Sequence, residues 1–404
     1  MALVIKAGLL IDGLGNTHKD MQILIVDDKI VQVASSVDAG PDARVLDHSK
    51  GTVMPGLIDA HLHITSSGDP DTLTRLRMGV PYTTLVGAVQ ARKTLEAGIT
   101  AIRDAGAGFN TALDLKRAVN DGLVPGPRMV VSGRGLSISG GHGDPANGWP
   151  PELQFAGRRP VDSPDEARKA AREELALGAD CVKMCATGGV MSMGTDHTAR
   201  GLTEDEMRAA IEEAHNRKKR SLAHAQGTEG IKNAIRAGID SIEHGFWLDD
   251  EAIELMLEND VFLVPTLAAV YHIVEAGTEK GVPPHAVEKA KFGQAAHLVS
   301  FKNALDAGVK IAMGTDAGTP FNRHGENALE LKLMVDAGMT PMQAIVASTS
   351  LAAEILDLNA GAVREGCLAD LIVVDGDPTE DVTCLSEKEN IKMVMLGGDI
   401  KVER

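Results

Sequence analysis

The chain carries at residues 56–63 the stretch that decides its interpretation, Gly56-Leu57-Ile58-Asp59-Ala60-His61-Leu62-His63. The apolar run predicts a strand, and this strand ends in a His-x-His pair. Because side chains alternate across a strand, the imidazoles of His61 and His63 point to the same face. Two imidazoles on one face are suitable ligands for a divalent metal ion. The alternative is two histidines that are hydrogen-bonded inside a polar core, and the rest of the chain bears on this choice.

The composition is typical of a soluble globular protein. Of the 404 residues, 44% are hydrophobic and 24% are charged. The formal net charge of −17 disfavours a nucleic-acid partner, because a polyanion would be repelled. Residues 1–6 are too short an apolar run for a signal peptide, and no run reaches the ~20 apolar residues that cross a bilayer. The four cysteines do not suggest a disulfide framework. We therefore expect a cytoplasmic protein without a membrane partner.

Both ends of the chain have a strand-rich texture. Short apolar runs are separated by turn residues such as Asp12-Gly13 and Gly397-Gly398-Asp399. The expected strands are Leu3–Ala7, Leu9–Ile11, Gln22–Val26, Lys29–Val33, Leu371–Val374 and Lys392–Leu396. The two ends are therefore predicted to meet in one small β-sandwich domain, built from residues 1–56 and 360–404.

The middle of the chain, residues 57–359, alternates strands with helices. The expected strands are Leu57–Ile64, Thr100–Asp104, Met129–Ser132, Cys181–Cys185, Ser221–Ala225, Ser241–His244, Val261–Pro265 and Lys310–Asp316. The clearest helical patterns are Pro164–Leu177, Glu204–Arg217, Gly230–Ala237 and Asp249–Glu258. Eight strands with intervening helices predict a (β/α)₈ TIM barrel, with a doubly wound open sheet as the alternative. In a barrel, catalytic residues belong at the carboxyl ends of the strands.

Two connections are longer than a barrel requires. Residues Gly133–Asp162 form a Gly/Pro-rich segment that contains His142, and Thr266–Asp306 contains Tyr271, His272 and a helical pattern. Long loops in compact domains are usually functional or disordered. We expect both connections to act as lids over the mouth of the barrel.

Further metal-competent residues follow the later strands. Lys183 lies in the strand Cys181–Cys185, where a buried ammonium would be costly unless an adjacent carboxylate pairs with it. The two cysteines of this strand are better explained by core packing than by metal ligation. His224 and His244 end two strands 20 residues apart, and Asp316 ends the eighth. Each histidine alone would be structural, and Asp316 alone would be an N-cap.

Together these residues resemble the order of the amidohydrolase superfamily, and the resemblance covers nearly the whole chain. The superfamily has His-x-His on strand one, lysine on strand four, histidines on strands five and six, and aspartate on strand eight. The resemblance implies that Lys183 is N-carboxylated by CO2 or bicarbonate and bridges two divalent ions, most simply Zn²⁺. It further implies that His61, His63 and Asp316 hold one ion and that His224 and His244 hold the other. Asp316 would then accept and return the reacting proton, and His142 would stabilise the oxyanion.

Within the superfamily the chain is similar to the imidazolonepropionase-related group of Xaa-Pro dipeptidases, Xaa-Lys/Arg carboxypeptidases and enzymes that cut ochratoxin. The stretches that carry this likeness are Gly140–Asp144, Lys183–Gly189, Val190–Ser192, His224-Ala225, Ile242–Gly245 and Gly314–Gly318. The group implies a substrate amide, in a dipeptide or small molecule, with a free α-carboxylate on the leaving side. It also implies a homo-oligomer. Candidates for the carboxylate contact, all of which could equally be surface residues, are His142, Arg200, Tyr271, His272, Arg323 and His324.

One departure leaves the leaving amino acid open. Several dipeptidases of the group carry a tyrosine soon after the strand-five histidine, whereas Gln226-Gly227-Thr228 stands here. Proline, a basic residue and an aromatic amino acid all remain possible. A hydrolase of cyclic amides such as imidazolones or hydantoins is the second hypothesis. A non-catalytic barrel scaffold is the third, and it is disfavoured because scaffolds of this kind typically lose metal ligands.

Overall fold

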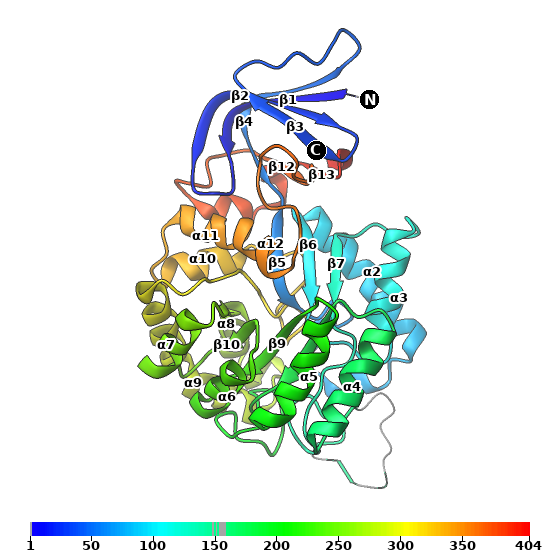
Figure 1. Ribbon diagram of the computed structural model, residues 1–404, viewed down its shortest axis with the longest axis vertical. Helices are drawn as coiled ribbons and strands as arrows, with labels where there is room; N and C mark the ends of the chain where they lie inside the picture. The colour runs from blue at the N-terminus through cyan, green and yellow to red at the C-terminus, as the bar shows by residue number, and fades with distance from the viewer. Residues whose placement is uncertain (1, 148, 151, 153–158) are drawn as a thin grey trace.

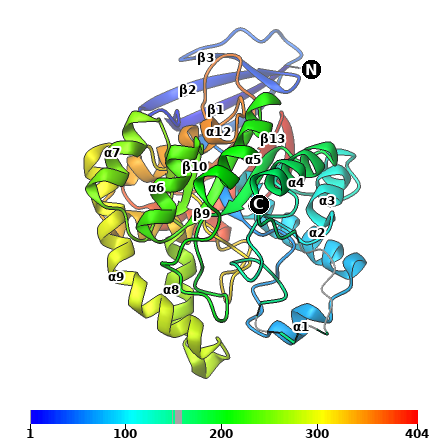
Figure 2. The same cartoon turned by 60° about the horizontal axis from the view of Figure 1, so that its bottom comes forward.

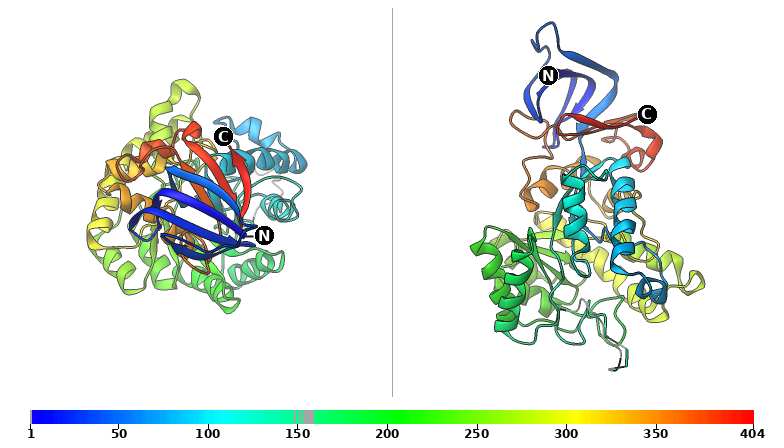
Figure 3. Two further views of the ribbon diagram at one scale, coloured as in Figure 1. Left: turned by 90° about the horizontal axis from the view of Figure 1, so that it is seen from above. Right: turned by 90° about the vertical axis from the view of Figure 1, so that its right-hand side faces the viewer.

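The computed structural model describes residues 2–147, 149–150, 152 and 159–404. A β domain stands above a barrel surrounded by helices, as Figure 1 shows, and the side view in Figure 3 separates the two parts. Both termini lie in the β domain.

Strands from both ends of the chain form one seven-stranded sheet in the order β14-β13-β12-β4-β1-β2-β3. Strand β1 pairs parallel with β4, and all other pairs are antiparallel. Ile5 and Ile23 from the N-terminal strands share one buried cluster with Val373 and Met393 from the C-terminal strands. The prediction of a β domain built from both ends is confirmed. Its strands are β1 (Ala2–Ile11), β2 (Thr17–Val26), β3 (Lys29–Ala34), β4 (Arg44–Pro55), β12 (Leu371–Val374), β13 (Ile391–Leu396) and β14 (Asp399–Glu403).

The chain passes from the β domain into the barrel at Gly56, between β4 and the first barrel strand. A Cβ at Gly56 would lie 2.2 Å from Thr100 Oγ1, so only glycine fits this close approach. The barrel strands form two parallel sheets, β5-β6-β7 and β11-β10-β9-β8. They are β5 (Leu57–Leu62), β6 (Ile99–Asp104), β7 (Arg128–Val131), β8 (Cys181–Cys185), β9 (Arg220–Ala225), β10 (Ser241–His244) and β11 (Phe262–Val264).

The eighth predicted strand, Lys310–Asp316, is an irregular closing segment in the structure. It hydrogen-bonds to β11 on one side, where Leu263 N–H donates to Lys310 O, and to β5 on the other, where Ala60 N–H donates to Met313 O. Near its end, the Thr315 N–H donates both to His61 O on β5 and to the Asp59 carboxylate, which also accepts the Thr315 hydroxyl. The segment still closes the ring between β11 and β5, so the predicted barrel is confirmed.

The helices pack outside the strands around one large apolar core. Helix α4 begins at the Ser163 N-cap, and α5 begins with a capping box formed by Thr203 and Glu206. No helix in the described ranges is both long enough and apolar enough for a membrane span. The helices are α1 (Thr72–Leu76), α2 (Val80–Glu96), α3 (Thr111–Asn120), α4 (Pro164–Ala176), α5 (Glu204–Asn216), α6 (Thr228–Ala237), α7 (Asp250–Glu258), α8 (Leu267–Ala276), α9 (Pro284–Ala307), α10 (Leu329–Asp336), α11 (Pro341–Ala347) and α12 (Ser350–Ile355).

The long connection after β11 contains two helices, α8 and α9, where the sequence predicted one. Figure 2 brings the lower end of the barrel forward, with α1 on one side and α8 and α9 on the other. The other predicted lid, Gly133–Asp162, lies partly outside the described residues.

Candidate active site

A cavity of about 850 Å³ opens at the carboxyl ends of the barrel strands. Its wall contains all six predicted metal ligands together with His142. Parallel strands of a barrel bring their carboxyl ends to one face, so residues distant in sequence meet there. The ligands are His61 and His63 at the end of β5, Lys183 on β8, His224 on β9, His244 on β10 and Asp316 on the closing segment.

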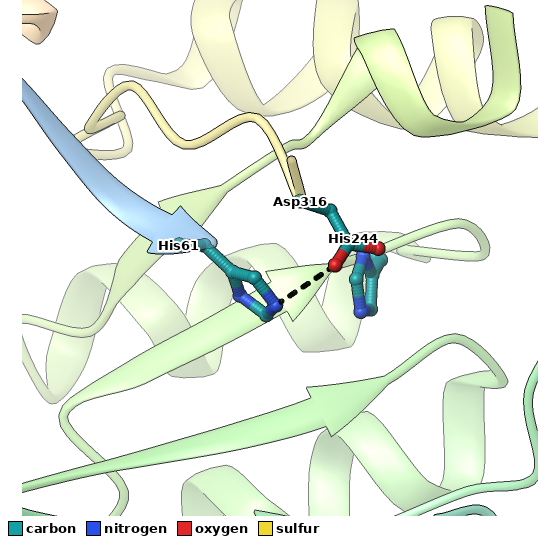
Figure 4. A group of neighbouring side chains, drawn as sticks. All are labelled: His61, His244 and Asp316. Atoms are coloured by element: carbon teal, nitrogen blue, oxygen red, sulfur yellow. Dashed lines mark ion pairs between the residues drawn. The ribbon is translucent and has the colours of Figure 1, made fainter. Parts of the chain in front are cut away.

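His61, His244 and Asp316 point toward one another from three different elements, as Figure 4 shows. Their ligand atoms all lie within 4.8 Å of one another. Asp316 Oδ1 lies 3.6 Å from His61 Nε2 and 3.3 Å from His63 Nε2. The ring of His224 is 4.5 Å from the ring of His244, measured between centroids. The four imidazoles therefore form one cluster around the carboxylate.

Hydrogen bonds to fixed acceptors set the ring orientation of three of these histidines. His63 Nδ1 donates to Gly106 O at 2.8 Å. His244 Nδ1 donates to Thr266 Oγ1 at 2.7 Å, because the Thr266 hydroxyl is itself committed as a donor to Pro265 O. His61 Nδ1 lies 2.5 Å from Glu243 Oε2 and donates to that carboxylate. Each ring then keeps its lone pair on Nε2, and in His61 and His63 this nitrogen faces the Asp316 carboxylate.

His224 has the opposite orientation. Its Nε2 donates to the backbone carbonyl of Gly188 at 2.8 Å, which leaves the lone pair on Nδ1. The next residue, Gly189, leaves room for the His142 ring, since a Cβ there would lie 2.2 Å from His142 Nδ1. His142 in turn stacks on His224 with the ring centroids 3.9 Å apart.

The donor set fits a divalent cation. Asp316 Oδ1 is buried and has no hydrogen-bond partner among the described residues. The lone pairs of the Nε2 atoms of His61 and His63 converge on this oxygen. These lone pairs and the carboxylate oxygen repel one another unless a cation or a proton lies between them. Burial opposes a charged His63, but the Asp316 carboxylate outweighs it and raises the pKa of His63. A metal ion would take the place of that proton.

Four residues of the cavity wall have left-handed backbone conformations that side chains rarely adopt. They are Phe109 (φ 57°), His244 (φ 76°), Thr266 (φ 55°) and Asp316 (φ 57°). Such conformations persist where the surrounding structure imposes them, and they gather at functional sites. At Thr266 the buried Glu330 carboxyl group accepts the next two backbone N–H groups, those of Leu267 and Ala268, at 2.8 and 2.7 Å.

Lys183 has no carboxylate within 4 Å of its ammonium nitrogen in the described part of the chain, so the ion pair considered for it is not formed. It is 5% exposed, and burial lowers its pKa, which favours the neutral amine. Burial likewise raises the pKa of the Cys181 thiol to about 12 and raises that of Cys185. Both cysteines are thiols at neutral pH, which suits core packing better than metal ligation.

His142 is the one predicted substrate contact that lines the cavity. Burial lowers its pKa to about 3, so its ring is neutral at physiological pH. Ser192 Oγ lies 2.8 Å from Nδ1, and when this hydroxyl donates, His142 Nε2 carries a hydrogen that can bind an oxyanion.

The other predicted contacts lie off the cavity wall. Arg200 and Arg323 are exposed, Tyr271 is 37% exposed and His272 is half-buried. His324 is buried, but its Nε2 bonds to the backbone carbonyls of His63 and Ser66. Arg200, Arg323 and His324 lie in loops and Tyr271 and His272 on α8, and none of these five residues lines the cavity.

Two arginines that the sequence reasoning missed do line the cavity, Arg134 and Arg159. Arg134 pairs with Glu174 at 2.6 Å, and Arg159 pairs with Glu173 at 2.5 Å. Each guanidinium has five N–H donors, so both keep donors for a ligand. The sequence could have pointed to them, because Arg134 lies at the start and Arg159 near the end of the connection Gly133–Asp162, which also contains His142.

A second part of the wall is apolar. It contains Val190, Met191, Phe246, Val270 and Ile273, which belong to one hydrophobic cluster around α8 and α9. Arg134 follows the third barrel strand whereas α8 follows the seventh, so the cationic and apolar walls come from different sectors of the ring. The cavity can therefore accept a ligand with one anionic and one apolar part.

Known proteins resemble this chain along its whole length. The model of a family described as the amidohydrolase family matches residues 52–401. Ochratoxinase of Aspergillus niger is 34% identical over 423 aligned residues, which cover 98% of this chain and 86% of that protein. A Xaa-Pro dipeptidase solved with methionine bound in its active site has a TM-score of 0.92 at 33% identity and covers 99% of both chains. A dihydroorotase of Pelotomaculum thermopropionicum is 26% identical over 413 residues, 95% of this chain and 91% of that protein.

Proposed function

The chain belongs to the amidohydrolase family and is a hydrolase of amide bonds, and from this premise we propose a more specific activity. The enzyme uses two divalent metal ions, most simply Zn²⁺, to cleave the amide of a C-terminal amino acid that has a free carboxylate. The substrate is a dipeptide or an N-acyl amino acid. The observation that carries the proposal is the convergence of four histidines, Lys183 and Asp316 on one cavity that also has two arginines on its wall.

The order of these residues in the superfamily supports a division of the ligands. His61, His63 and Asp316 would hold one ion, and His224 and His244 the other, with N-carboxylated Lys183 between them. His244 also lies near the first group, since its ligand atom and those of His61 and Asp316 are within 4.8 Å of one another. The lowered pKa of Lys183 supports this role, because only a neutral amine attacks CO2. Bound ions would supply a nucleophilic hydroxide at neutral pH and polarise the amide carbonyl.

The protein's own groups carry the proton and orient the substrate. Asp316 accepts the proton of the attacking water and passes it to the leaving nitrogen. His142 donates from Nε2 to the carbonyl oxygen as negative charge develops there. The apolar wall at Phe246 and Val270 receives a side chain of the substrate and excludes water.

The arginines suit the substrate's carboxylate, because guanidinium binds this group through charge-assisted hydrogen bonds. The methionine in the active site of the dipeptidase is itself an amino acid with a free carboxylate and an apolar side chain. Its carboxylate matches the arginine wall of this cavity, and its side chain matches the apolar wall. We favour Arg159, since its partner Glu173 is 43% exposed and solvent weakens that ion pair, whereas Glu174, the partner of Arg134, is fully buried.

The test compares matched substrates. Dipeptides and N-acyl amino acids are assayed as free acids and as C-terminal amides, beside hydantoins and imidazolones. A charge-assisted contact contributes about 1.5–3 kcal/mol, so amidation should lower kcat/KM by about tenfold to a hundredfold. Equal rates for acid and amide, or faster opening of the rings, would favour a cyclic-amide hydrolase, the class of the dihydroorotase relative.

Arg159→Ala should reproduce the loss on the free acid by about tenfold to a hundredfold and leave the rate on the amide nearly unchanged. Arg323→Ala is the matched control, since this arginine is exposed and lies off the cavity wall. If both variants kept the wild-type preference for the free acid, the carboxylate contact at Arg159 would be wrong.

A further inference from the structure

A buried ion pair lies beneath the site. Arg103, on β6, is fully buried, and its three N–H-bearing nitrogens each have a partner. Nε donates to Ala60 O at 2.6 Å, Nη1 to Ser241 Oγ at 3.2 Å and Nη2 to Glu243 Oε1 at 2.9 Å. These hydrogen bonds thus join three barrel strands, β5, β6 and β10.

Glu243 is also fully buried, and both of its oxygens are used. Oε1 accepts from Arg103 and from the Ser241 hydroxyl, the latter at 2.5 Å. Oε2 accepts from His61 Nδ1 at 2.5 Å. A buried guanidinium needs a counter-ion, so Glu243 is the carboxylate in this network.

The ion pair by itself is a weak explanation for these residues. A buried salt bridge is often no more stabilising than apolar side chains of similar volume, and the interior of such a barrel is usually packed with branched apolar residues. The third partner, His61, supplies a better reason. Among the four clustered histidines, His61 alone donates to a carboxylate, whereas His63, His224 and His244 donate to neutral carbonyl or hydroxyl oxygens.

We propose that Glu243, held by Arg103, is a positioning residue that fixes the tautomer and the ring orientation of His61 and so keeps the lone pair of His61 on Nε2, toward Asp316. This inference rests on the proposed metal centre. Partners of this kind orient metal-binding histidines and raise their basicity, and their loss typically lowers metal affinity about 10–100-fold.

The experiment measures metal affinity apart from turnover. Metal-free wild type and Glu243→Gln are titrated with Zn²⁺ against a chromogenic chelator, and thermal unfolding of the metal-free proteins checks the fold. The variant should lose about 10–100-fold in affinity for one ion while the affinity for the other changes little. A downfield proton resonance from His61 Nδ1–H should be present in the wild type and absent from the variant.

Two further variants separate positioning from stability. Arg103→Met/Glu243→Met removes both charges, so it leaves no unpaired ion, and its affinity for the same ion should remain low. Asp370→Asn breaks another buried carboxylate pair, with Arg128 at the opposite end of the barrel, and should leave both affinities unchanged.

Wild-type affinity for both ions in Glu243→Gln and in the double variant would overturn the positioning role while leaving the metal centre intact. If Glu243→Gln does not fold, the double variant and the wild-type resonance decide. A wild type that binds no ion would overturn the metal centre and this inference with it.

Discussion

The two ends of the barrel contain the same kind of ion pair in different settings. At the amino end, Arg128 pairs with Asp370 at 2.6 Å, and Asp370 also accepts the backbone N–H of Gly397. These partners join the barrel to the β domain, and the network ends there. At the carboxyl end, Arg103 pairs with Glu243, which continues to His61 and from there into a cavity.

The polar groups differ in the same way. Every oxygen of the buried Asp370 carboxylate has a hydrogen-bond donor. At the other end, Asp316 Oδ1 and Gln226 Oε1 are buried without a hydrogen-bond partner among the described residues, and both residues line the cavity. Buried polar atoms are almost always paired, so such orphans need an explanation. The Arg128–Asp370 pair is thus fully satisfied within the protein, whereas two acceptors on the cavity wall have no donor among the described residues, as expected where a ligand binds.

The largest effect should follow the loss of Lys183. Lys183→Met keeps the volume and removes the amine, so the bridge between the ions cannot form, and both bound metal and turnover should be lost. In Lys183→Ala a small added carboxylic acid should restore part of both. Metal analysis and initial rates check this, and near-normal rates with two ions bound in either variant would contradict a bridging carbamate.

Asp316→Asn should lower kcat by about 10²–10⁴-fold, the usual contribution of a group that transfers a proton in the reaction. The matched change at the amino end, Asp370→Asn, should lower the free energy of unfolding by about 1–3 kcal/mol because it leaves Arg128 without its partner, while kcat stays the same. Initial rates and thermal unfolding of both variants compare the effects on kcat and on stability. An equal loss of kcat in Asp370→Asn and Asp316→Asn would contradict the difference between the two ends.

The smallest effect concerns Glu330, which holds the start of α8 at the carboxyl end. Burial raises the pKa of Glu330 from 4.5 to about 8. The folded protein therefore binds a proton more tightly than the unfolded chain between these values, and this carboxyl costs stability as the pH rises through that window. As the pH rises from 4.5 to 8, the stability of Glu330→Gln should increase relative to that of the wild type. This holds even if the variant is less stable than the wild type at pH 4.5. Apparent Tm against pH measures this, with the exposed Glu326→Gln as control, and parallel curves for Glu330→Gln and wild type would refute it.

Much of this account was predictable from the sequence, because it depends on local patterns. Strand alternation placed His61 and His63 on one face, and the strand–helix period placed His224 and His244 at neighbouring strand ends. The contact that joins the closing segment to Asp59 of β5 was not predictable, since Asp59 and Thr315 are 256 residues apart in the sequence. The same holds for the substrate wall. Arg159 and Arg200 are both loop arginines, and only the path of the loop decides which one faces the cavity.

The central claim is that the groups at the carboxyl end bind two divalent ions, and metal content tests it most directly. Purified wild type should hold up to two ions per chain, and His61→Ala and His244→Ala should each hold fewer and lose turnover. Asp370→Asn should keep the wild-type content. Full metal content and activity in both histidine variants would contradict the account.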